Sequence, residues 1–196
     1  MKIKAEGWLS GVRRIASPNF DTRPPGTAID LLVIHNISLP PGEFGGKAVA
    51  QLFTNVLDTE AHPYYAQLQG LKVSAHFLVR RNGEIIQFVP CGKRAWHAGT
   101  SLWRGRSCCN DFSVGVELEG SDHVPFSDRQ YVALARLTRV LQRVYPLRAI
   151  VGHADIAPAR KTDPGPFFDW PRYLAKLRGN PARHGSERAG QLAQRT

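Results

Sequence analysis

Residues 149–165 read AIVGHADIAPARKTDPG. The apolar run 149–151 is typical of a short buried strand, so we expect His153 at the end of that strand. Asp163 follows in a loop stiffened by the next proline and glycine, and such a loop can bring its carboxylate back beside His153. Loops at strand ends often carry functional residues on a rigid base. The stretch therefore predicts both a strand and a functional site at its end.

A second histidine stands at the end of an apolar run far upstream, where residues 31–34 (LLVI) lead into His35 and Asn36. Two strand-end histidines and one loop carboxylate are what a catalytic zinc site needs, since such sites use three protein ligands and leave one position open for water. The sequence contains no short His-x-x-x-His motif that joins these residues, so a plain structural interpretation stays open. In this structural interpretation, His153 caps the strand end and Asp163 caps a turn.

The composition is that of one globular domain. The chain has 196 residues, of which 42% are hydrophobic and 21% charged, and this is enough for a single good core. No apolar stretch is long enough to span a bilayer, and the first residues lack the apolar centre of a signal peptide, so we expect a cytoplasmic protein without membrane contact. Cys91, Cys108 and Cys109 lack metal-ligand or disulfide spacing, so we expect reduced thiols used for packing.

The net charge of +10 is unevenly distributed. From residue 171 to the end there are six Lys/Arg and one Glu, which gives +5. Residues 179–196 hold few large apolar side chains, so we expect a basic, disordered tail after a folded domain over residues 1–178. Basic charge also attracts nucleic acid. Because no nucleic-acid-binding motif accompanies it, solvation is the simpler interpretation and no nucleic-acid partner is expected.

Apolar runs predict five strands, at residues 31–35, 75–80, 84–89, 113–118 and 149–152. The turn signal Arg81–Asn82–Gly83 joins the second and third of these strands into a hairpin. Interleaved helical patterns favour a mixed α/β (α+β) fold, in which a central mixed sheet of about five to six strands is flanked by helices.

The clearest helix is predicted from Asp128 to Tyr145, since Ser127 and Gln130 form a capping-box pattern and a proline follows. Its core-facing side is expected to consist of Tyr131, Leu134, Leu137, Thr138, Leu141 and Val144. Shorter helices are expected over 48–56 and 170–177, with Asp169 as the N-cap of the second.

Several ordered motifs resemble one known family. They are VIHNISLPPGEFG at 33–45, VSAHF at 73–77, RAWHAG at 94–99, NDFSVGVELEG at 110–120, GH at 152–153 and IAPARKTDPGP at 156–166. Together they are similar to the AmpD-type amidases, the cytoplasmic anhydro-N-acetylmuramoyl-L-alanine amidases of bacterial wall recycling, over residues 7–175. The resemblance implies the fold shared with phage lysozyme-type amidases and peptidoglycan-recognition proteins.

The resemblance also implies an activity. It is the zinc-dependent hydrolysis of the amide between the lactyl group of (anhydro-)N-acetylmuramic acid and L-alanine in muropeptides, linked by family to control of β-lactamase induction. The partner is then a small muropeptide, and a monomer is favoured. The alternative is a non-catalytic module that binds peptidoglycan fragments, since some relatives of this fold bind without cutting.

Five residues match functional positions of the family. His35, His153 and Asp163 match the zinc ligands, Glu117 the catalytic acid/base and Lys161 the stabiliser of the oxyanion. Imidazoles and a carboxylate suit Zn²⁺, and a cation beside a metal ligand suits a place where negative charge develops. The plain alternative for the lysine is a solvated side chain that pairs with Asp163.

Strand alternation places Glu117 and Glu119 on the same face of their strand, so the pattern alone does not choose between these two carboxylates. Asp155 also competes for the acidic ligand role, but its place near His153 suits a supporting or capping part better. His76, in the middle of a strand, is expected to be a hydrogen-bonded core or groove residue.

Five further residues are substrate-binding candidates: Asn36, Trp96, His97, Arg106 and Arg160. The asparagine neighbours a ligand, and the Trp–His pair can stack on sugar rings or belong to the core. The arginines can hold the carboxylates of a substrate peptide by paired hydrogen bonds, or can be ordinary exposed arginines. The loop 38–46, rich in Pro and Gly, is expected to form a wall or lid beside the metal.

Overall fold

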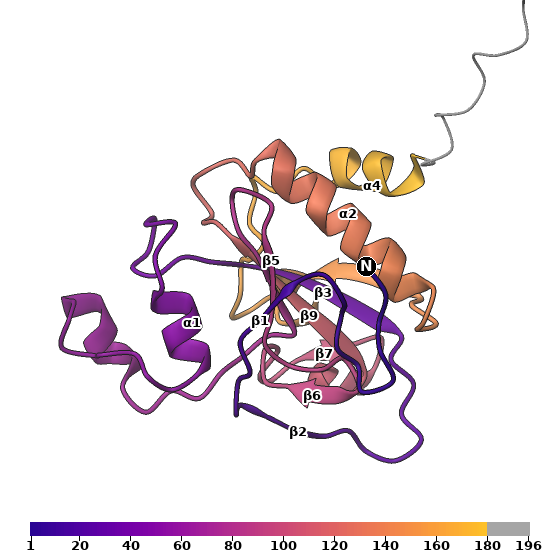
Figure 1. The fold of residues 1–196 in the computed structure, drawn as a ribbon, viewed down its shortest axis with the longest axis horizontal. Coiled ribbons are helices and arrows are strands. Elements are labelled where there is room, and N and C mark those ends of the chain that lie inside the picture. Colours follow the sequence, from indigo (N-terminus) through magenta and orange to yellow (C-terminus); the bar gives the residue numbers. More distant parts are fainter. Residues whose placement is uncertain (180–196) are drawn as a thin grey trace, which may run out of the picture.

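The structure is a computed structural model that describes residues 1–179. A six-stranded mixed sheet forms its centre (Figure 1). Its strands follow the spatial order β1 (Arg13–Arg14), β5 (Ile85–Gln87), β4 (Phe77–Val79), β9 (Ser113–Glu119), β3 (Leu31–Ile37) and β10 (Ala149–Gly152). Neighbouring strands are parallel except for the antiparallel pair β4 and β5. This confirms the predicted mixed sheet.

Smaller elements surround this sheet. Two-stranded sheets pair β2 (Phe20–Thr22) with β6 (Lys93–Ala95) and β7 (Leu102–Trp103) with β8 (Arg106–Ser107). The helices are α1 (Ala48–Phe53), α2 (Asp128–Gln142), α3 (His153–Ile156) and α4 (Trp170–Arg178), with 3₁₀ helices η1 (Pro63–Leu68) and η2 (Cys109–Asp111). No helix within residues 1–179 is both long and apolar enough to cross a membrane.

The main core lies between one face of the sheet and α2. Apolar side chains of β3, β9 and α2 pack there, and they include Leu32, Ile34, Val114, Val116, Leu118, Leu134, Leu137 and Leu141. The predicted capping box of Ser127 and Gln130 is confirmed at the start of α2. The prediction for Val144 is wrong: the helix ends at Gln142, so this side chain lies beyond it and is exposed.

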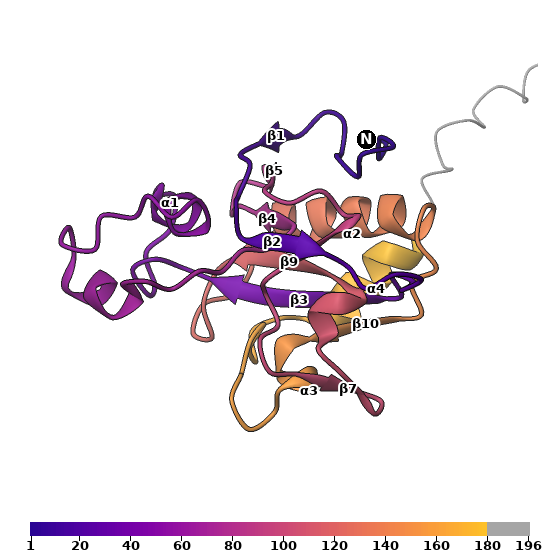
Figure 2. The same cartoon turned by 90° about the horizontal axis from the view of Figure 1, so that it is seen from below.

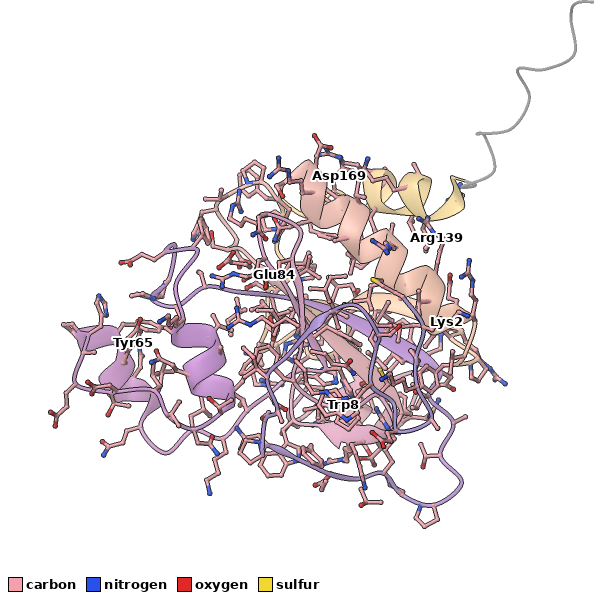
Figure 3. All side chains as sticks on the ribbon, viewed as in Figure 1. Lys2, Trp8, Tyr65, Glu84, Arg139 and Asp169 are labelled. Carbon is pink, nitrogen blue, oxygen red and sulfur yellow. The ribbon has the colours of Figure 1, made fainter. Side chains whose placement is uncertain are left out.

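Helix α4 packs against α2 (Figure 1). The buried hydroxyls of Thr138 and Tyr173 are 2.7 Å apart, and Arg139 donates to the carbonyl of Lys176. Asp169 accepts from the backbone N–H of Arg172, which confirms the predicted N-cap. Figure 3 labels Arg139 and Asp169 near α4.

A second apolar cluster joins α1 and η1 to strands β4 and β5. The segment that contains α1 and η1 projects from one end of the sheet (Figure 2). Tyr65 of η1 belongs to it (Figure 3), as does Phe53 of α1, whose ring meets that of Phe88 edge-on. Of the three free thiols, Cys91 and Cys109 are buried as expected, but Cys108 is exposed and is not a packing residue.

The sheet register positions the site. Strands β3, β9 and β10 are parallel, so their carboxyl ends meet at one edge of the sheet. His35 lies beside Glu117 in the register, and Ile34 lies beside Gly152, which directly precedes His153. Paired residues of parallel strands point to the same face. The topology therefore brings together three polar side chains that are far apart in the sequence.

The five predicted strands, the predicted hairpin and the three predicted helices are all present, with small differences at their ends. One difference concerns the site, since His153 begins α3 instead of ending the strand. The predicted tail over 179–196 falls, from residue 180 onward, outside the described residues.

Candidate active site

Three side chains converge at the carboxyl ends of β3 and β10. The Nδ1 atoms of His35 and His153 are 3.0 Å apart, and Oδ2 of Asp163 lies 2.9 Å from the first and 3.1 Å from the second. Both imidazoles are buried, and the carboxylate is largely so. The structure thus brings together the three residues predicted as metal ligands.

The charges of this cluster favour a cation. Burial lowers the pKa of His35 to about 4, so its ring is neutral near pH 7. Burial by itself would raise the pKa of Asp163, but its close contacts with His153 and His35 hold it below its ordinary value, so the carboxylate is ionised. Two imidazole nitrogens and one anionic oxygen at this spacing are a donor set that Zn²⁺ prefers. The residues present therefore fit a zinc ion.

Glu117 lies on β9 beside His35 and is buried. Its Oε2 has no hydrogen-bond partner among the described residues. Burial, reinforced by the negative charge of Asp163, raises the pKa of Glu117 well above its ordinary value, and Lys161 only partly opposes this. A buried carboxyl with a raised pKa and a free oxygen is able to exchange a proton with a bound molecule.

Glu119, the other carboxylate on this face of β9, has a different environment. Its Oε1 accepts from the Gly45 N–H at 2.7 Å and from Arg80 at 3.2 Å, and its Oε2 accepts from the Arg81 N–H at 3.0 Å. The side chain thus ties the loop 38–46 to the turn between β4 and β5. The two glutamates, which the sequence pattern could not separate, are distinguished by their partners.

A cleft of about 450 Å³ opens beside the cluster. It is lined by the end of β3 with Ser38 and Pro41, by Tyr64, by the segment 121–123 and by residues 160–163. Asp163 faces the cleft, and Lys161 lines it as well. Oδ2 of Asp163 faces the imidazoles of the two histidines, and the described residues show no ion pair between Lys161 and this carboxylate, so the alternative of a Lys161–Asp163 pair is not observed.

Asp122 holds the loop that carries Asp163. Its Oδ1 accepts from Asn36 at 2.7 Å and its Oδ2 accepts from the hydroxyl of Thr162 at 2.5 Å. A Cβ at Gly165 would lie 2.3 Å from Oδ1 of Asp122, so only glycine fits this close approach. Sequence reasoning missed Asp122, because its role depends on this approach and not on any local motif.

A family model of the N-acetylmuramoyl-L-alanine amidases matches residues 25–166 of this chain. The chain belongs to the N-acetylmuramoyl-L-alanine amidase family. It is 56% identical over 170 residues to the 1,6-anhydro-N-acetylmuramyl-L-alanine amidase AmpD of Escherichia coli K12, which covers 86% of this chain and 93% of that protein. With AmpD of Citrobacter freundii it shares 55% identity over 181 residues, 91% of this chain and 96% of that protein.

Solved structures agree with this relationship. A crystal structure of a Se-Met AmpD derivative superposes with a TM-score of 0.88 at 54% identity and covers 90% of this amidase and 99% of that chain. The amidase AmiD of E. coli, solved in complex with anhydro-N-acetylmuramic acid-L-Ala-D-gamma-Glu-L-Lys, superposes with a TM-score of 0.54 at 34% identity. That match covers 89% of this amidase and 65% of AmiD.

Two of the substrate-binding candidates line the cleft of this amidase, but both are already engaged. The side-chain amide of Asn36 donates to Asp122 and to the carbonyl of Pro164. Nη2 of Arg160 donates to the carbonyls of Ala98 and Thr100. Each therefore supports the walls of the cleft, and a contact with substrate would have to use their remaining polar atoms.

The other three candidates lie outside the cleft lining. Trp96 donates from its indole nitrogen to Asp21. Arg106 pairs with Asp30, which precedes β3, and its guanidinium stacks on Phe112. The ring of His97 is buried behind His35, with the ring centres 5.0 Å apart.

Two other predictions for polar residues can be compared with their contacts. Asp155 accepts from the Gly152 N–H at 2.7 Å and caps α3, which confirms the capping role. His76 is fully buried, accepts from the Gly115 N–H and faces the Lys93 carbonyl, so it is a hydrogen-bonded core residue as expected.

Proposed function

We propose that this amidase uses zinc to hydrolyse the amide between the lactyl group of anhydro-N-acetylmuramic acid and L-alanine, as a cytoplasmic enzyme of peptidoglycan recycling. The observation that carries the proposal is the convergence of His35, His153 and Asp163, whose facing atoms all lie within 3.1 Å of one another. Relatives named for this reaction that cover most of the chain support the substrate class. Residues 1–178 are the proposed catalytic domain of a monomeric enzyme.

In the proposed reaction, His35, His153 and Asp163 hold the zinc ion. Bound zinc supplies a Lewis acid that lowers the pKa of water at the site and polarises the amide carbonyl. Glu117 takes a proton from the attacking water and later passes it to the leaving nitrogen of alanine. Its raised pKa suits both steps, because a proton taken up by this carboxyl is retained until the amine leaves.

Lys161 is the proposed partner of the negative charge that develops on the lactyl carbonyl oxygen. It lines the cleft beside Asp163, and its charge is close enough to Glu117 and His35 to lower the pKa of each. A fixed cation beside the reacting carbonyl stabilises charge that exists only as the reaction proceeds. The peptide carboxylates of a muropeptide would also be attracted by this lysine and by Arg160.

The direct test is mass spectrometry of a synthetic anhydromuropeptide incubated with the full-length chain. The chelator-treated protein, the same protein with zinc restored and a blank without protein are compared. The proposal predicts that only the zinc-restored protein yields the anhydro-sugar acid and a peptide with a free alanine amine. An uncleaved substrate that still binds to zinc-loaded protein would instead identify a non-catalytic binding module.

A parallel reaction with the matching reducing-sugar muropeptide defines the substrate class. Comparable turnover of the two substrates would show that the anhydro ring is not required, while leaving the amidase chemistry intact.

A further inference from the structure

Two consecutive buried residues, His97 and Ala98, contact the Nε2 atoms of the two candidate histidine ligands. His97 contacts His35, and Ala98 contacts His153. Nε2 of His153 lies 3.1 Å from the carbonyl oxygen of Ala98. A carbonyl oxygen can only accept a hydrogen bond, so a His153 ring with a single hydrogen carries it on Nε2. The opposite nitrogen, Nδ1, then keeps its lone pair and directs it at the position between His35 and Asp163.

The tautomer of His35 follows from a chain of three contacts. The hydroxyl of Ser113 donates its single hydrogen to the carbonyl of Cys109 at 2.6 Å, so towards Nε2 of His97, at 3.1 Å, it acts as the acceptor. Nε2 of His97 therefore carries the hydrogen, and Nδ1 of this buried, neutral ring is an acceptor. That Nδ1 lies 3.0 Å from Nε2 of His35. His35 accordingly donates from Nε2 and keeps the lone pair of its own Nδ1.

The rest of the structure fixes these two residues in place. Oδ1 of Asn110 accepts from the backbone N–H groups of His97 and Ala98, at 3.2 and 2.8 Å. Nη2 of Arg160 donates to the Ala98 carbonyl at 2.9 Å, and this is the same oxygen that accepts from His153. The ring of His97 packs closely against Gly115, where a Cβ would lie 2.4 Å from its Cγ. Neither Nδ1 of His97 nor the carbonyl of Ala98 can therefore change its orientation without breaking buried contacts.

We propose that His97 and the carbonyl of Ala98 are positioning groups that hold both imidazoles in the tautomer whose Nδ1 binds zinc. This inference rests on the proposed zinc site, and it replaces the expected place of His97 in a sugar groove. A histidine in the other tautomer would present an N–H to the metal and would have to exchange its proton before binding. Loss of a hydrogen-bond partner that orients a ligand typically weakens metal binding by about 10- to 100-fold.

The tautomers can be measured in the unmodified protein. Two-bond ¹H–¹⁵N correlation spectra of the folded, metal-free, full-length chain distinguish Nδ1–H from Nε2–H for each imidazole. The proposal predicts the Nε2–H form for His35, His97 and His153. A predominant Nδ1–H form of His35 would overturn it, whatever the behaviour of any variant.

Two substitutions at one position separate the acceptor from the bulk of the ring. In His97→Asn the amide oxygen takes the place of Nδ1 and can accept from His35, whereas His97→Leu has a similar size and no acceptor. Zinc affinity, measured by competition with a chromophoric chelator, should fall by roughly 10- to 100-fold in the Leu variant and by clearly less in the Asn variant. The Leu variant should also contain an increased fraction of the Nδ1–H form of His35.

The possible results distinguish the two proposals. If the wild-type chain binds no zinc, the proposed function fails. If the wild-type chain binds zinc and the folded Leu variant binds it equally well, only the positioning role is wrong. Should the Leu variant not fold, the spectra of the wild-type chain still decide the question.

Discussion

Replacement of Glu117 by Gln should stabilise the metal-free protein. The same change should strongly reduce the turnover of the zinc-loaded protein. The carboxyl is buried, its Oε2 has no partner, and its pKa is raised well above the ordinary value by burial and by Asp163. A carboxyl with a raised folded-state pKa binds its proton more tightly in the folded chain than in the unfolded one. Stability therefore declines as the pH rises from about 4.3, the ordinary value for Glu, towards the raised value.

The size of this stabilisation follows from the free-energy cost of an unpaired buried polar group, which is about 1–3 kcal/mol and more when the group is charged. The amide of Gln still leaves one polar atom unpaired, so we expect Glu117→Gln to recover about 1–2 kcal/mol at neutral pH. For a domain of this size 1 kcal/mol corresponds to roughly 2–4 °C, which gives an increase in Tm of about 2–8 °C. Turnover with zinc restored should fall by about 10²- to 10⁴-fold.

Glu119→Gln is the matched control on the same face of β9. Its carboxylate accepts three hydrogen bonds, from Gly45, Arg80 and Arg81, so this change should destabilise the protein by about 1.5–3 kcal/mol. Thermal and urea unfolding of chelator-treated wild type and both variants, at pH 4 and pH 7.5, measures the direction of both stability changes. At pH 4 Glu117 is protonated in the wild type, so the gain in stability of its Gln variant should shrink towards zero. A Gln variant at position 117 that is less stable than wild type at pH 7.5 would refute the reasoning.

Three further outcomes are expected. Lys161→Met should lower kcat by about 10²- to 10³-fold with zinc affinity unchanged, as measured by steady-state assay and chelator competition; equal kcat would exclude the lysine from charge stabilisation. Asp163→Asn removes the anionic ligand and should abolish stoichiometric zinc in metal analysis of the purified variant, whereas retention of one zinc per chain would place the metal elsewhere. The acid limb of kcat/KM should lie above the pH range in which an exposed Glu titrates, because burial raises the pKa of Glu117, and the limb should disappear from the residual activity of Glu117→Gln.

The sequence predicted the central elements because their signals are local. Residues 31–34 and 113–118 are apolar runs of strand length, and the capping box at Ser127 marks the start of α2. The two-residue strands β1, β7 and β8 could not be predicted, since their pairing is set by the sheet and by tertiary contacts and not by a periodic pattern. Val144 fits the helical period but lies beyond the end of the helix.

The candidate ligands were found because each follows or ends a recognisable motif. Their convergence depends on the parallel register of β3, β9 and β10, which no single segment encodes. The same limit applies to His97: the motif left a place in a sugar groove and a place in the core open, and only the structure, in which the ring packs on Gly115, places it behind His35. Asn110 and Asp122 act entirely through such long-range contacts.

Anomalous diffraction from crystals of the zinc-loaded protein, recorded on both sides of the zinc absorption edge, tests the central claim most directly. We predict one strong peak that lies about 2.0–2.1 Å from Nδ1 of His35 and of His153 and about 2.0–2.2 Å from a carboxylate oxygen of Asp163. A zinc peak away from these three atoms, or none at this position in fully loaded crystals, would contradict the account.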